Sequence, residues 1–146
     1  MKIQQLSLFL ENKPRALRVP TRILAEAGIS ILTMSLADTE QFGILRLIVP
    51  DAQRAKGILE KAGAVVNVTE VVAVEVPDRA GGLDGVLAVI EKESLNVEYV
   101  YSFTARKGDR AVLVFRFDDP DKALRLLAAH GVAVVTELDG FLTPGT

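Results

Sequence analysis

The sequence predicts a mixed α+β fold built from two copies of a β-α-β-β-α-β unit. Three observations predict it. At a shift of 66 residues, ENKPRAL at 11–17 aligns with PDRAGGL at 77–83. After the second hairpin the shift becomes 68, and Gly63 then aligns with Gly131. Both halves also contain strand-like and helix-like apolar patterns in the same order. Such a repeat indicates an ancient duplication.

The first copy opens with a strand and a helix. Residues 3–10 alternate between apolar and polar, which is typical of a strand with one buried face. A helical stripe follows and is expected to stop at Gly28. Pro20 has no backbone N–H and is tolerated only in a first turn, so the helix is predicted to start near Leu17 after a lengthened loop.

A hairpin and a second helix complete this copy. Residues 29–38 and 42–50 are β-rich runs on either side of the three-residue turn TEQ. Asp51 is expected to cap the second helix and Gly63 to end it. Residues 64–68 then read as a closing strand.

The second copy repeats this order, with strands at 71–76, 95–105, 110–117 and 132–137 and helices at 83–93 and 120–130. Each copy is therefore predicted to be ferredoxin-like, with an antiparallel four-stranded sheet and both helices on one face. The chain is expected to divide into domains at 1–69 and 70–146. The apolar run VVAVEV leaves no flexible linker between them, so two packed subdomains are expected.

Composition narrows the function. The chain has 146 residues, a net charge of −2 and no cysteine, which excludes disulfides, thiolate catalysis and cysteine-bound metals. It offers no basic field to nucleic acid or anionic lipid, and no apolar run reaches the length of a membrane span. The cytoplasm is the expected location, and neither nucleic acid nor membrane is an expected partner.

No catalytic constellation is found. The single histidine, His130, falls in the last turn of a predicted helix, where a structural role is favoured. The acidic run at 118–121 sits where a helix begins and is predicted to cap it. The aromatic residues of the central strands in the second copy are spaced so that they fall on the same face of the sheet as apolar residues. This favours core packing over RNA binding. The protein is predicted not to be an enzyme and to need no metal or cofactor.

The loops after the first strand of each copy contain the candidate ligand-binding residues. Asn12 and Asp78 end the first strand of each copy, and eighteen residues later Ser30 and Asn96 open the second strand. We expect the loop and this strand start to lie at the same edge of the sheet. A glycine pair in the second copy lets the backbone approach a ligand, and the N–H groups of a helix start favour a carboxylate. Asp78 would take an ammonium, so a zwitterion such as an amino acid fits. The alternative is that these residues only form Asx turns.

The chain also resembles tandem ACT domains, and more closely the stand-alone bacterial and archaeal proteins made of two ACT domains. The resemblance covers residues 1 to about 137 and rests on FLENKP with the leucine that follows it at 17, and on RILAEAGI, FGILRLIV, VAVEVPDRAGGL and NVEYVY. It implies that amino acids bind to the first loop and the start of the second strand at interfaces between ACT sheets. It also implies a regulatory or sensor role; the alternative is a ligand-free subunit that interacts with a separate enzyme of amino-acid metabolism.

Mapped by position, the resemblance implies two sets of ligand-binding residues: Asn12, Lys13, Arg15, Ala16, Leu17, Ser30 and Ile31; and Asp78, Arg79, Ala80, Gly81, Gly82, Leu83, Asn96 and Val97. The first set departs from the family pattern because Arg15 and Ala16 replace glycines. Arg15 either blocks the pocket by its volume or clamps a carboxylate, so the second copy is predicted to hold the better-formed site. Open sheet edges predict a homodimer.

Overall fold

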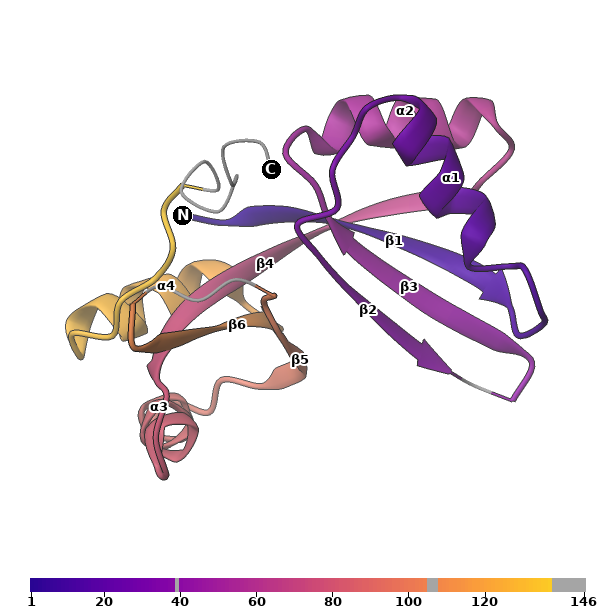
Figure 1. The fold of residues 1–146 in the computed structure, drawn as a ribbon. Coiled ribbons are helices and arrows are strands. Elements are labelled where there is room, and N and C mark those ends of the chain that lie inside the picture. The colour runs from indigo at the N-terminus through magenta and orange to yellow at the C-terminus, as the bar shows by residue number, and fades with distance from the viewer. Residues whose placement is uncertain (39, 105–107, 138–146) are drawn as a thin grey trace. The chain divides into compact units, whose positions relative to one another are not determined.

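The computed structural model describes residues 1–38, 40–104 and 108–137, which form two compact units. One unit comprises Gln4–Thr69; the other starts at Glu70 and includes Met1–Ile3. Each is a ferredoxin-like unit of the predicted α+β class (Figure 1). Whether the two act as separate domains with boundaries at 69 and 70 stays a prediction.

The unit Gln4–Thr69 follows the predicted order of elements: β1 (Ile3–Glu11), α1 (Arg18–Glu26), β2 (Thr33–Asp38), β3 (Phe42–Ile48), α2 (Ala52–Lys61) and the start of β4 (Val66–Pro77). The strands lie in the order β2-β3-β1-β4, and β3 runs antiparallel to both β1 and β2. Both helices cover one face of this sheet (Figure 1). The core between them includes Leu8 of β1, Leu24 of α1 and Leu59 of α2, because the alternation in β1 turns every second side chain toward the helices.

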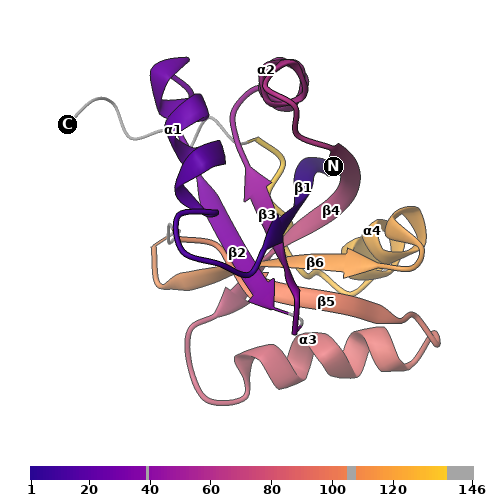
Figure 2. The ribbon, with the colours of Figure 1, turned by 90° about the vertical axis from the view of Figure 1, so that its right-hand side faces the viewer.

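The second unit contains the rest of β4, then α3 (Gly82–Glu91), β5 (Val97–Ser102), β6 (Arg110–Phe117) and α4 (Pro120–Ala129). Its strands lie in the order β4-β6-β5, and Figure 2 shows α3 and α4 beside them. One apolar cluster joins Val86 of α3, Leu127 of α4 and the stacked rings of Phe115 and Phe117 in β6, so both helices pack on the same face.

Two predicted strands differ from the structure. The strands expected at 64–68 and 71–76 are one continuous strand, β4, because no turn-forming residue interrupts its β-branched sequence. The closing strand predicted at 132–137 is reduced to a bridge between Val74 and Val134. Two backbone hydrogen bonds flank this bridge, from Glu75 N to Ala133 O (2.9 Å) and from Val135 N to Ala73 O (2.8 Å).

The predicted helix boundaries are confirmed by local chemistry. Asp51 accepts a hydrogen bond from Arg54 N at the start of α2. Asp119 does the same for Lys122 N in α4, where Pro120 occupies the first turn. Leu17 directly precedes α1, as the position of Pro20 predicted.

His130 ends α4, and its Nδ1 lies 3.0 Å from Leu126 O, a structural contact of the predicted kind. None of the described helices is both long and apolar enough to cross a membrane.

Candidate functional site

The loops that join the first strand to the first helix have the same backbone pattern in both units. Lys13 N donates to Glu11 O at 2.9 Å, and Arg79 N donates to Pro77 O at 2.9 Å. Ala16 N then bonds Lys13 O at 3.4 Å, as Gly82 N bonds Arg79 O at 3.0 Å. These pairs are the ones that the shift of 66 residues aligns. The two loops are therefore structural equivalents, as the sequence repeat predicts.

Both loops need a residue with positive φ at the same place. Gly81 has φ 86°, and its equivalent Arg15 has φ 75°. A side chain in this left-handed region costs roughly 1 kcal/mol, which glycine avoids. Arg15 is exposed, and it is not among the described residues that line the cavity of its unit. Arg15 therefore does not fill this cavity.

The next position explains why the two loops are not identical. A Cβ placed on Gly82 would lie 2.0 Å from Pro77 O, so only glycine fits there. This close approach lets α3 begin at Gly82 itself. Ala16 carries a Cβ at the equivalent place, and α1 begins two residues later in the aligned sequence, at Arg18. The loop of the first unit is consequently longer, as predicted.

Within one unit, the loop after the first strand and the start of the second strand lie at opposite ends of the strands. The expectation that they share one edge of the sheet is therefore wrong. Pro77, before the loop, pairs with Arg110, whereas Val97 pairs with Phe117 at the other end of β6. Arg110 and Phe117 are seven residue steps apart along β6, a distance of roughly 23 Å. The reason is topological: the helix runs antiparallel to the first strand, so the second strand starts where the first began.

The unit Gln4–Thr69 shows the same separation. Glu11, before its loop, pairs with Phe42 at one end of β3. Thr33 pairs with Ile48 at the other end, and the predicted site residues Ser30 and Ile31 precede Thr33. In each unit the predicted site is thus divided between opposite ends of the strands. The loop part is 12–17 or 78–83, and the strand part is 30–31 or 96–97.

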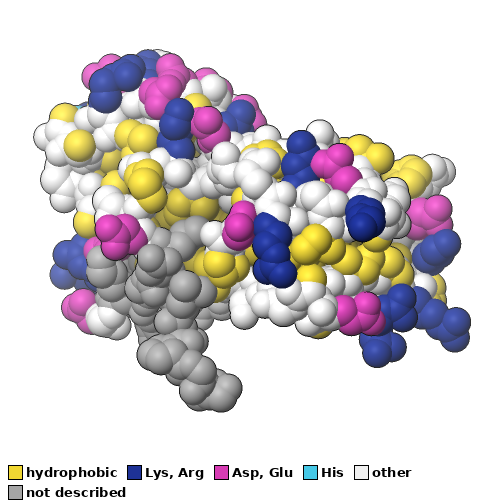
Figure 3. Space-filling view, turned by 90° about the horizontal axis from the view of Figure 1, so that it is seen from above, with side chains coloured by type: hydrophobic (Ala, Val, Ile, Leu, Met, Phe, Trp, Pro, Cys, Tyr) yellow, Lys and Arg dark blue, Asp and Glu magenta, His cyan; other side chains and the backbone are white. Residues whose placement is uncertain are grey.

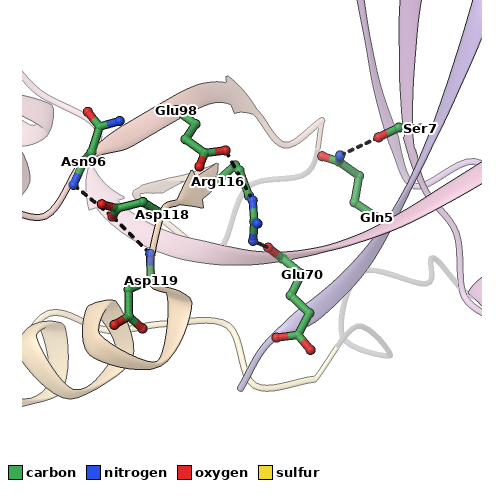
Figure 4. A network of polar contacts seen from close by, with 8 residues as sticks. All are labelled: Gln5, Ser7, Glu70, Asn96, Glu98, Arg116, Asp118 and Asp119. Carbon is green, nitrogen blue, oxygen red and sulfur yellow. Dashed lines mark hydrogen bonds and ion pairs between the residues drawn. The ribbon is translucent and has the colours of Figure 1, made fainter.

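Asn96, in the strand part, is fixed through its backbone. Its N–H donates to Asp118 Oδ1 at 3.1 Å, and Asp118 N donates to Asn96 O at 3.2 Å. The same carboxylate accepts from Asp119 N at 3.0 Å, at the cap of α4. Figure 4 shows that the Asn96 amide points away from Asp118. The exposed amide therefore keeps its donor and acceptors available, on a rigid base.

Each loop borders a cavity inside its own unit. The cavity of the second unit has a volume of about 300 Å³ and is lined by Glu75, Pro77, Arg79–Gly82, Gly85, Val86, Arg110 and Gly131–Ala133. The cavity of the first unit has about 260 Å³ and is lined by Leu8–Glu11, Lys13, Ala16, Val19, Pro20, Ile23, Leu59 and Ala62–Ala64. The two cavities occupy equivalent places in the repeat: the first loop, the first helix and the end of the second helix.

Only part of each predicted residue set lines these cavities. Lys13 and Ala16 line the first, and Arg79–Gly82 line the second. The remaining predicted loop residues, Asn12, Arg15, Leu17, Asp78 and Leu83, are exposed and lie outside the described linings.

The residues around Gly63 and Gly131 were missed as parts of these linings. The order of elements in the sequence could have predicted them. In a β-α-β-β-α-β unit the second helix ends at the same end of the sheet as the loop after the first strand.

The charges at the two cavities differ. Two basic residues, Arg79 and Arg110, line the second together with the buried acidic residue Glu75. At the first, Lys13 Nζ lies 2.7 Å from Glu11 Oε2, so positive and negative charges stand side by side. The hydrogen bond from Lys13, and then its charge, hold the pKa of the Glu11 carboxyl below its usual value. Among the residues that the structure describes, no group of His, Asp or Glu is arranged to hold a metal ion.

The Glu11–Lys13 pair makes a direct prediction. Replacing Lys13→Ala is expected to return the pKa of Glu11 to the ordinary range, because the donor that stabilises the carboxylate is removed. Carbon-detected NMR titration of the Glu11 carboxyl measures this pKa. Arg22→Ala, on the same unit but beside Glu26, is the control and is expected to leave the Glu11 titration unchanged. An unchanged titration in Lys13→Ala would contradict the assignment.

The helix face above the first cavity presents apolar and charged groups together. Figure 3 looks onto α1 and α2, where hydrophobic side chains lie between charged ones. Val19 of α1 is half exposed, although it lines the cavity. The cavity wall therefore continues onto the surface of the unit.

Comparison with known proteins agrees with this architecture. A family model described as an ACT domain pair matches residues 1–141. The crystal structure of protein BT0572 from Bacteroides thetaiotaomicron is 34% identical, with a TM-score of 0.89 over 98% of both chains. The ligand-free regulatory subunit of aspartate kinase from Thermus thermophilus has a TM-score of 0.62 at 17% identity, over 88% of this chain and 91% of that one.

The regulatory subunit of aspartate kinase from Thermus flavus gives similar values, a TM-score of 0.60 at 16% identity over 86% of this chain and 90% of that one. At such identities the likeness shows the fold. The curated proteins contained no significant match.

The family match spans nearly the whole sequence. The resemblance drawn from the sequence motifs is confirmed. This chain belongs to the family of ACT domain pairs.

Proposed function

We propose that this protein is a regulatory binding protein without catalytic activity of its own, and that the loop of its second unit holds an amino acid. The observation that carries the proposal is the cavity of about 300 Å³ beside this loop. Its lining combines backbone that only glycine permits at Gly82 with two basic residues, Arg79 and Arg110, and with the buried Glu75. Such a wall suits the carboxylate of a small molecule.

The ligand's two charges are assigned to different parts of the loop. The carboxylate lies against Arg79 and the start of α3, where the helix dipole favours negative charge. The ammonium is assigned to Asp78, an exposed carboxylate one residue before Arg79. An amino acid presents both charges on one carbon, so it can contact both neighbouring residues.

The strand part of the site is assigned to another ACT sheet. Within the second unit, Asn96 and Val97 lie at the sheet edge opposite to the loop, so they do not reach a ligand held there. A second copy of the chain would supply them across a homodimer interface, in which the exposed Asn96 amide binds the ligand of its neighbour. This arrangement requires a dimer, whose mass light scattering measures.

A thermal-shift screen of the full chain against the twenty amino acids tests the proposal. A ligand that binds only the folded state is expected to stabilise it by about 2.7 kcal/mol at a hundredfold excess over Kd. Calorimetric titration of the best ligand should then show weaker binding for Asp78→Ala and Asn96→Ala. Asn67→Ala, an exposed asparagine of the other unit, is the control and is expected to bind normally.

If Asp78→Ala and Asn96→Ala both bind as the unaltered chain does, the proposed site is wrong. If no amino acid raises the melting temperature, the second function class is indicated, a ligand-free subunit that regulates a separate enzyme. The fold that the chain shares with regulatory subunits of aspartate kinase favours keeping this class as the alternative.

A further inference from the structure

Basic residues lie on the outside of both helices of the first unit, next to the apolar cavity between them. Arg18 and Arg22 of α1 and Lys61 of α2 are all exposed. Their chain neighbours Val19 and Ala62 line the cavity, and Val19 is itself 50% exposed. Figure 3 shows this face, with Lys and Arg side chains beside hydrophobic ones. An apolar opening with cations on both sides is the result.

Helix stability does not explain the two arginines. The dipole of a helix disfavours positive charge at its start, where Arg18 lies. This helix has neither a side-chain cap nor an acidic residue in its first turn, whereas each of the other helices has an aspartate there: Asp51, Asp84 and Asp119 or Asp121. Arg22 lies 3.9 Å from Glu26 with both side chains largely exposed, so this pair adds little stability.

The positive charge is a property of the first copy alone. Residues 4–69 include eight basic and six acidic residues, while the rest of the chain has nine and thirteen. Glu11, the acidic residue at the cavity, is paired with Lys13, so the cations outside set the sign of the surface. The repeat aligns Arg18, Val19, Arg22 and Lys61 with Asp84, Gly85, Ala88 and Ala129. The shared fold therefore does not require these residues.

The spacing of the charges suits an extended partner. Arg18 and Arg22 are four residues apart on α1, a rise of roughly 6 Å, and neither belongs to the described lining of the cavity. A small molecule inside the cavity therefore does not reach both. A polypeptide can place one apolar side chain in the cavity and carboxylates along the helix outside it.

We propose that the first unit binds an acidic segment of another protein through one bulky aliphatic or aromatic side chain. The apolar side chain enters the cavity of about 260 Å³ beside Val19 and Ile23. Carboxylates of the same segment pair with Arg18 and Arg22. A buried apolar anchor inside a charged rim is the usual arrangement of a protein–protein contact. This surface lies in the first unit and does not depend on the amino acid proposed for the second.

The experiment uses the full chain and a fluorescein-labelled peptide with the repeated sequence Glu-Glu-Leu. One control peptide has glutamine in place of every glutamate, and another has serine in place of every leucine. Fluorescence anisotropy measures affinity. The first peptide is expected to bind saturably and at least about tenfold more tightly than either control, because both the charges and the anchor contribute. Added salt is expected to weaken it, since exposed charges are screened.

Matched variants locate the contact. Arg22→Glu is expected to weaken peptide binding about tenfold, because an attraction becomes a repulsion. Arg125→Glu changes the net charge by the same amount at an exposed arginine of α4 and is expected to leave the affinity unchanged. Val19→Ser keeps every charge and removes apolar surface at the rim of the cavity, so a loss of about fivefold is expected.

Three results would overturn the proposal. One is the absence of saturable binding of the Glu-Glu-Leu peptide, and another is an equal loss of affinity in Arg22→Glu and Arg125→Glu. The third is equally tight binding of an oligouridylate or of phosphatidylserine vesicles, with the same loss in Arg22→Glu, which would show a general anion-binding surface. None of these results bears on amino-acid binding by the second unit, so failures of the two proposals are distinguishable.

Discussion

Gly82→Ala is expected to destabilise the second unit by about 2–3 kcal/mol, the usual cost of forcing extra volume into a packed position. The added Cβ would lie 2.0 Å from Pro77 O and 3.3 Å from a methyl carbon of Val76. The first of these atoms belongs to the backbone at the end of β4, so no side-chain rotation relieves the overlap. The loop must move, and the hydrogen bond from Gly82 N to Arg79 O moves with it.

The first unit shows how the loop would respond. With Ala16 at the aligned position, the equivalent hydrogen bond is 3.4 Å long and the helix starts two residues later. A similar change in Gly82→Ala would unwind the start of α3 and remove the backbone surface on which the proposed carboxylate site depends. Amino-acid binding is therefore expected to fall together with stability.

Gly85→Ala is the matched control, three residues along the same helix. A Cβ there meets no atom within 4 Å, and alanine favours helix over glycine by about 1 kcal/mol. This variant is expected to be as stable as the unaltered chain or more so. Urea unfolding followed by circular dichroism measures both changes. Equal stability of the two variants would contradict the close approach at Gly82.

The elements of the fold followed from local chemistry, which is why they could be predicted. A capping aspartate such as Asp51, or a proline such as Pro20, restricts the backbone within one turn of helix. The short closing strand of the second unit could not be predicted in the same way. Residues 132–137 pair with β4 only through the bridge between Val74 and Val134. The length of such a pairing depends on the partner strand, and the sequence at 132–137 does not contain that information.

The candidate site was predicted less well, because it depends on the direction of strands as well as on residue types. In the repeat Asp78 matches Asn12 and Asn96 matches Ser30, yet Asp78 and Asn96 lie near opposite ends of the strands of their sheet. A helix that returns antiparallel to its strand makes this separation unavoidable. The same topology brings Gly131 to the edge of the loop, so the cavity joins residues some fifty positions apart.

Phe115→Ala is expected to have the largest effect on stability, a loss of about 3–5 kcal/mol. Phe115 is fully buried in β6, and its ring lies 5.3 Å from that of Phe117 with an angle of 2° between the planes. The truncation removes a stacked contact and leaves a void between the sheet and the two helices of the second unit.

Two controls test whether this loss comes from the void. Phe115→Leu keeps most of the apolar volume and is expected to cost roughly 1.5 kcal/mol or less. Tyr99→Ala removes a larger ring, but this side chain is half-buried on β5, so a smaller loss than for Phe115→Ala is expected. Urea unfolding measures all three variants. If Tyr99→Ala cost as much as Phe115→Ala, ring size would decide stability and the buried stack in β6 would not be the centre of this core.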